Sequence, residues 1–394
     1  GRLADHALRR HRKQWRTAMA FLDEVSMVSA DQFLQCDVRL RQAKIQPNMR
    51  FGNLAMNICG DFLQLPPVDK HGTRKSLARP VNDTGGVEGE CEHIDEVSPD
   101  SAKEKQRKEQ AALEGRQGFD CWRSIDLVVN LEVNVRAPGE IGRMQAEMRA
   151  GKISNKTWDD YTSRVMEPGD RRLQDTASPF AKHPITFIVH RHKIRVLRSL
   201  QTAREESRKS GMPLYLVQAR DEAVRSEDRA KLTHVVSAEL LRRVNPDQTK
   251  GLPSFLPLYV GMRLLLASKD CVRIGIMKGC PCVVQSIVLA DDEPVPLRPV
   301  AGDPHLLKYM PVSLLLRAEG AKWVLPKSEL PSSLPRDVDR RGLFQVRPTY
   351  DYLSFQCGVE YISVRHTTFK VMPADTTRVY TAQGGTFDAV IADM

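Results

Sequence analysis

Long hydrophobic runs are missing from this sequence of 394 residues. No stretch approaches the roughly 18 consecutive apolar residues that a membrane-spanning helix needs, and the first residues lack the apolar segment of a signal peptide. Cysteine pairs with metal-ligand spacing are also missing. The eight cysteines stand at irregular intervals, with no C-x-x-C pair and a single C-x-C at Cys280 and Cys282. We therefore expect an intracellular protein without a membrane partner, a zinc module or a disulfide framework.

Acidic residues are fewer than basic ones, 49 against 59, and the formal charge is +10. A polyanionic partner is plausible on this basis, although net charge governs association and does not identify a fold. At roughly 100–200 residues per domain, the length allows two to four domains.

Two short apolar runs end in polar residues. Residues 18–22 lead into Asp23 and Glu24, and residues 54–59 lead into Gly60 and Asp61. Between them, Ser29 and Gln32 form a capping box before an apolar stripe with helical spacing. The order strand, helix, strand predicts a parallel α/β sheet of buried strands, with the acids at the carboxyl ends of the strands.

Aromatic residues are absent from residues 69–117, which hold nine basic and eleven acidic residues. This composition predicts a mostly disordered insertion, with a charged helix near residues 102–113. Alternating α/β character resumes beyond it. We expect a strand over residues 127–131, a helix over 139–150, a strand over 185–189, a helix over 193–207, a small β subdomain over about 256–350, and strand and turn over 377–391.

Two longer motifs surround the predicted acids. Residues 22–29 (LDEVSMVS) and residues 60–68 (GDFLQLPPV) resemble the Walker B motif and motif III of the Pif family (petite integration frequency) of DNA helicases, relatives of RecD in helicase superfamily one. Residues 122–136 are similar to the stretch that leads into motif IV, and residues 380–390 are similar to motif V. This chain has Tyr380 and Thr381 where the family commonly has His-Lys.

The resemblance implies an α/β fold with tandem RecA-like motor domains of the P-loop NTPase type. On this basis we expect the C-terminal part of a first domain in residues 1–68, the insertion in 69–117, and the end of the first domain with the motif IV junction in 118–138. A second RecA-like domain is expected in residues 139–394, with a small β-barrel-like insert at about 256–350, ending after motif V.

The resemblance also implies an ATP-dependent DNA helicase that moves 5′ to 3′ and acts in DNA repair, recombination or telomere maintenance, in the nucleus or the mitochondrion. Its cofactors would be ATP and Mg²⁺, and its partner would be single-stranded DNA and duplex junctions. By motif position, Asp23 would ligate Mg²⁺, Glu24 would position water and Arg136 would stabilise the transferring phosphoryl group. Gln64 would sense the γ-phosphate as a further catalytic residue, and Asp61, Gln383 and Gly384 would complete the nucleotide site.

The phosphate-binding Walker A loop, G-x-x-x-x-G-K-[ST], is missing: Gly151 and Lys152 are followed by Ile153. Motif VI is missing too. We expect both to lie beyond the two ends of this sequence, and the isolated chain to be inactive. Two alternatives stay open: a degenerate relative that binds DNA without catalysis, and an interaction scaffold centred on residues 69–117.

Overall fold

The computed structural model describes residues 18–68, 76–78, 102–135, 137, 139–167, 169–173, 175–242, 248–268, 274–294, 300–331, 338–357, 360–385 and 387–393. The chain divides into two compact units, Gly1–Pro168 and Gly169–Met394. The start of a second domain at residue 139 stays a prediction. Helices α4 (Glu140–Ala150) and α5 (Asn155–Thr162) belong to the first unit, where an ion pair joins α4 to residue Asp61.

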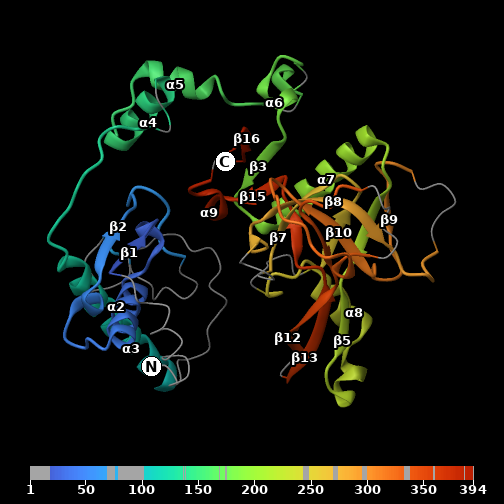
Figure 1. The fold of residues 1–394 in the computed structure, drawn as a ribbon, viewed down its shortest axis with the longest axis horizontal. Coiled ribbons are helices and arrows are strands. Elements are labelled where there is room, and N and C mark those ends of the chain that lie inside the picture. The colour runs from blue at the N-terminus through green and yellow to red at the C-terminus, as the bar shows by residue number, and fades with distance from the viewer. Residues whose placement is uncertain are drawn as a thin grey trace. The chain divides into compact units, whose positions relative to one another are not determined.

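The first unit contains the predicted strand–helix–strand arrangement. Strands β1 (Met19–Leu22) and β2 (Ala55–Ile58) pair in parallel and are connected through α2 (Ala30–Lys44) (Figure 1). The capping interaction forms, because the backbone N–H of Ser29 donates to Oε1 of Gln32 at 3.1 Å. The α/β character predicted for this part of the chain is confirmed.

Helix α3 (Ala102–Arg123) packs on α2, and it confirms the charged helix predicted near residues 102–113. Residues 102–117 are helical, while 69–75 and 79–101 lie outside the described residues. The last turn of α3 supplies Cys121, which is fully buried, and Trp122, whose ring stands edge-on to Phe33 and Phe62 at 5.7 and 5.5 Å. The apolar end of α3 therefore anchors a helix whose first turns are highly charged.

The predicted burial of β1 on both faces is wrong for the described residues. Leu22 and Ile58 pack toward the α2–α3 core, whereas Phe21, on the opposite face of the pair, is 74% exposed. The run over residues 127–131, expected as a strand, has no regular secondary structure, and Leu127 is 78% exposed. Parallel strands are usually covered on both faces. In the described part of this unit, the α2–α3 layer covers only one face of the β1–β2 pair.

The second unit contains a parallel sheet of order β15–β3–β16, made of Thr376–Arg378, Ile185–Val189 and Ala389–Ala392. Helix α7 (His192–Ser210) follows β3. The strand predicted over residues 185–189 and the helix predicted over residues 193–207 are therefore confirmed.

An antiparallel sheet of order β11–β10–β8–β7–β14 forms the main core of this unit. Leu264, Cys282, Leu314 and Leu316 are almost completely buried in it. The expected barrel-like insert is not confirmed, because β11 and β14 stand at opposite ends of the strand order and do not pair in the described structure. The five strands are β7 (Arg263–Leu266), β8 (Pro281–Val288), β10 (Ser313–Ala318), β11 (Leu343–Val346) and β14 (Val371–Pro373).

The described residues of this unit form two further sheets of three strands each, with orders β6–β4–β9 and β12–β13–β5. None of the helices among the described residues is long and apolar enough to cross a membrane. The remaining elements are β4 (Leu214–Gln218), β5 (Arg220–Ala223), β6 (Phe255–Leu258), β9 (Pro304–Leu306), β12 (Thr349–Cys357), β13 (Glu360–Thr368), α6 (Pro179–Lys182), α8 (His234–Arg242) and α9 (Val379–Ala382).

Candidate active site

The two acids Asp23 and Glu24 stand directly after β1, at the carboxyl end of the parallel pair. Glu24 adopts a left-handed backbone conformation, with φ 55° and ψ 44°, and its N–H donates to Oδ1 of Asp23 at 2.9 Å. Such a conformation costs a residue other than glycine about 1–3 kcal/mol, so the surrounding contacts must hold it in place. The chain therefore turns sharply directly after β1.

Gly60 brings the end of β2 against this turn. The N–H of Val25 donates to the carbonyl of Cys59 at 3.0 Å, which extends the strand pairing past Glu24. A Cβ atom at position 60 would stand only 2.7 Å from the backbone nitrogen of Val25. Glycine is therefore required for the two strand ends to approach, and the approach places Asp61 beside the Asp23–Glu24 turn.

Asp61 and Gln64 form a tight turn beyond β2. The N–H of Gln64 donates to the carbonyl of Asp61 at 3.0 Å, and the N–H of Leu63 donates to Oδ1 of Asp61 at 3.0 Å. The guanidinium of Arg149, on α4, pairs with the other carboxylate oxygen, Oδ2. The hydrogen bond from Arg149 is the main cause that holds the pKa of Asp61 below its ordinary value. Asp61 is therefore a carboxylate at neutral pH.

Changing Arg149 to Met is expected to raise the pKa of Asp61 toward the ordinary aspartate value. The folded-state pKa of Asp61 is lowered, so the pair stabilises the fold above the ordinary pKa, and this contribution is lost as pH falls through the lowered pKa. The effect on stability is small, because Arg149 is more than half exposed. Carboxyl-carbon NMR titration measures the pKa, with Arg116→Met as control. An unchanged Asp61 titration would contradict the assignment.

Magnesium could be held at this edge by Asp23. Among the described residues, no three His, Cys, Asp or Glu side chains converge as a complete metal cage. Mg²⁺ is usually held by one or two carboxylates together with waters and phosphate oxygens. The exposed carboxylate of Asp23 suits that coordination. Nearby, Ser26 is 2% exposed and its hydroxyl has no hydrogen-bond partner.

The other predicted site residues are distributed differently. Arg136 lies outside the described residues. Gln383 and Gly384 lie in the second unit, after β15 and the single turn of α9. The N–H of Gln383 donates to the carbonyl of Val379 at 3.2 Å, and Gly384 has φ +73°, a conformation that favours glycine. Motif V therefore forms a tight turn beyond the carboxyl end of β15.

Two basic side chains meet at the same edge of the second sheet. Nη1 of Arg378, the last residue of β15, lies 2.5 Å from Nε2 of His192, at the start of the helix after β3. The carboxyl ends of parallel strands are where open α/β sheets bind ligands. The edges of both units thus present polar groups, in each case at strand ends.

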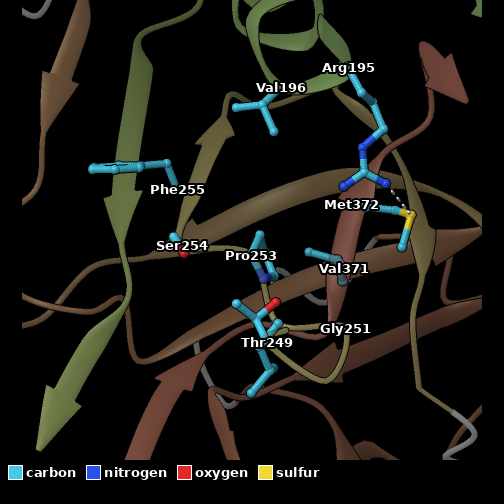
Figure 2. A pocket seen from close by; sticks show the side chains of 10 residues that line it. Arg195, Val196, Thr249, Gly251, Pro253, Ser254, Phe255, Val371 and Met372 are labelled. Atoms are coloured by element: carbon cyan, nitrogen blue, oxygen red, sulfur yellow. Dashed lines mark hydrogen bonds between the residues drawn. The ribbon is translucent and has the colours of Figure 1, made fainter. Parts of the chain in front are cut away.

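A small cavity lies between α7 and β14. Figure 2 shows Arg195 reaching toward Met372, with its Nη1 3.9 Å from the sulfur. Burial lowers the pKa of Arg195, and the nearby positive charge of Arg378 lowers it further. The cavity has a volume of about 30 Å³, which is room for a water molecule only. It is therefore too small to be a nucleotide site.

Sequence reasoning missed Arg149 and Ser26. Arg149 is a helical arginine 88 residues from its partner in sequence, and no local pattern marks it. Ser26 lies within the Walker B-like segment, and only its burial distinguishes it from the exposed serines of the chain.

Comparison with known proteins gives one family. Residues 6–84 match the sequence profile of the PIF1-like helicases. The human protein named ATP-dependent DNA helicase PIF1 is 51% identical over 49 residues, which are 12% of this chain and 8% of that protein. The Trypanosoma brucei brucei protein named ATP-dependent DNA helicase PIF6 is 36% identical over 73 residues, which are 18% of this chain and 9% of that protein. The matches thus span under a tenth of either relative.

Solved structures extend the likeness to the fold. The structure of Bacteroides Pif1 bound to ssDNA matches with a TM-score of 0.55 and 12% identity, over 100% of this chain and 67% of that one. The structure of Pif1 helicase from Candida albicans matches with a TM-score of 0.54 and 17% identity, over 98% of this chain and 67% of that one. The predicted α/β class and the resemblance to Pif helicases are confirmed.

Proposed function

We propose that this chain, which belongs to the PIF1-like helicase family, forms part of an ATP-dependent DNA helicase. The supporting observation is that Asp23 and Glu24 directly follow β1, while Asp61 lies in the turn beyond the parallel strand β2. Three carboxylates brought to one strand edge suit the binding and hydrolysis of a magnesium–nucleotide complex.

The roles of the first-unit residues follow from their positions. Asp23, exposed at the strand end, would hold Mg²⁺, which when bound would offset the negative charge of the phosphates. Glu24, next to Asp23 in the left-handed turn after β1, would position the attacking water and accept a proton from it. Gln64 is exposed, and its backbone N–H donates a hydrogen bond to Asp61. Its side-chain amide would contact the γ-phosphate, so that the turn after β2 would respond to bound ATP.

Motif position also assigns roles to the remaining predicted residues. Arg136 would stabilise the charge on the transferring phosphoryl group, a role worth roughly 10³–10⁵ in rate. Gln383 and Gly384 would contact phosphate or backbone groups at the edge of the second sheet, because glycine allows close approach of the loop.

The partner would be single-stranded DNA and duplex junctions. The +10 charge favours a polyanion. The human and trypanosome relatives are named ATP-dependent DNA helicases, and a related structure contains ssDNA. We further propose 5′ to 3′ movement, a role in repair, recombination or telomere maintenance, and an intracellular site in the nucleus or the mitochondrion.

The test is DNA-stimulated ATP hydrolysis by the protein that contains this chain. The Asp23→Asn variant should lose roughly 10²-fold or more in hydrolysis rate, because an amide offers Mg²⁺ no negative charge. Asp159→Asn, an exposed aspartate on α5, is the matched control and should leave the rate unchanged. DNA binding without hydrolysis in the unaltered protein would instead favour the non-catalytic alternative.

A further inference from the structure

A second surface of the molecule combines exposed aromatic and basic side chains. The sheet β12–β13–β5 has one face buried and one face open. On the buried face, Leu353, Phe355, Ile362 and Val364 pack with Val236 and Leu240 of α8. Because side chains alternate along a strand, the residues between them project from the opposite face.

The open face presents three tyrosines. Tyr350, Tyr352 and Tyr361 are 51%, 48% and 68% exposed. The register places Tyr350 opposite Thr367 and Tyr352 opposite Arg365, so these side chains share one face. The rings of Tyr350 and Tyr352 stand edge to face, with centroids 5.6 Å apart. Large rings exposed in a row are unusual in a chain whose aromatic content is only 6%.

Basic side chains surround the tyrosines. The guanidinium of Arg365 lies 5.5 Å from the centre of the Tyr350 ring and also pairs with Glu222 of β5. Arg220, two residues earlier on the same face of β5, is exposed. Two arginines and one acid leave this face with an excess of positive charge.

A groove lies beside Tyr352. It has a volume of about 650 Å³, within the range of small-molecule sites. Tyr352, Arg365 and Glu222 line it from the sheet, and exposed Arg229 adds a second guanidinium. Thus the groove offers an aromatic wall, cations for a phosphate, and a carboxylate that can accept a hydrogen bond from a base amino group.

We propose that this open face of β12–β13–β5 binds unpaired nucleotides of single-stranded DNA. Nonspecific single-strand binding sites combine a basic groove with rings on which bases stack, and this face has both. A base would stack on Tyr352 while Arg229 and Arg365 contact the flanking phosphates. This surface lies on a different sheet from the one that precedes Gln383 and Gly384. The proposal therefore adds a second DNA contact to the proposed function, and it rests on that function.

The test is DNA binding by the full chain, measured as fluorescence anisotropy of a labelled oligo(dT) of about 15 nucleotides. The double variant Tyr350→Ala, Tyr352→Ala should bind about tenfold more weakly, because one stacked base contributes about that factor. Trp158→Ala removes a ring that is 58% exposed on α5 and should change nothing. Tyr352→Phe keeps the ring and should bind normally. Thermal melts verify that each variant folds.

Photocrosslinking provides the direct readout. An oligonucleotide carrying 5-bromodeoxyuridine should form an adduct at Tyr350 or Tyr352, identified by mass spectrometry. Unchanged affinity in the double variant would overturn the inference and leave the proposed function intact. Weaker binding without an adduct at either tyrosine would also overturn it, since it excludes direct stacking. If the unaltered chain binds no oligo(dT), this inference fails, and the proposed function is judged separately by ATP hydrolysis.

Discussion

Changing Glu24 to Gln is expected to lower DNA-stimulated ATP hydrolysis by about 10²–10⁴-fold, while ATP binding is retained. The amide keeps the size of the side chain, but it cannot accept a proton from water. Glu24 follows Asp23 in a turn with a left-handed backbone, and the proposed Mg²⁺ ligand is Asp23 and not Glu24. Loss of the Glu24 carboxylate should therefore spare the carboxylate of Asp23 and the binding of the magnesium–nucleotide complex.

The measurement is steady-state hydrolysis with saturating single-stranded DNA, alongside equilibrium binding of a fluorescent ATP analogue. Glu239→Gln provides the matched control, because Glu239 is an exposed glutamate on α8 in the other unit. Hydrolysis that continues at the unaltered rate in Glu24→Gln would refute the assigned role. Loss of nucleotide binding in the same variant would mean that Glu24 acts in binding and not in proton transfer.

Changing Gly118 to Ala is expected to destabilise the first unit by about 1–3 kcal/mol or more. A Cβ atom at position 118 would stand only 1.7 Å from the carbonyl oxygen of Ala30, the first residue of α2. Backbone atoms cannot yield as a flexible side chain can, so α2 and α3 must separate. Alanine gains about 1 kcal/mol in helix propensity over glycine, which offsets only part of this cost.

Thermal denaturation followed by tryptophan fluorescence measures the effect, because Trp122 packs against Phe33 and Phe62 beside this contact. Gln117→Ala, at an exposed position one residue earlier in α3, is the control and should leave the melting temperature nearly unchanged. Displacement of α2 should also disturb the Asp23–Glu24 turn, which lies just before it in the chain. A Gly118→Ala melt equal to that of the unaltered chain would contradict the close helix contact.

The local elements of the first unit could be predicted because each has a local cause. Continuous apolar runs specified β1 and β2, and the Ser29–Gln32 pair marked the start of α2. The start of α3 could be predicted as a charged helix near residue 102, but its continuation to Arg123 could not. The burial of Cys121 and Trp122 depends on residues of α2 and the loop after β2, which no local pattern reveals.

The candidate site, too, could be predicted only in part from the sequence. Asp23, Glu24, Asp61 and Gln64 were identified from two motifs, because their residue types and spacing carry the chemistry. The partnership of Arg149 with Asp61, and the close approach of Gly60 to Val25, join segments that are distant in sequence. The tyrosine face of β12 and β13 likewise depends on strand register, which decides whether alternate residues face the core or the solvent.

The sequence by itself determined which residues carry the candidate chemistry and the local elements that hold them, since motif spacing and hydrophobic periodicity are properties of neighbouring residues. Tertiary structure alone decided which of these residues meet and which faces stay open. It brought Arg149 to Asp61, fitted Gly118 against Ala30, and left Tyr350 and Tyr352 exposed above a buried sheet face. Those outcomes depend on long-range packing and register, because contacts between distant segments arise only when whole elements are placed against one another.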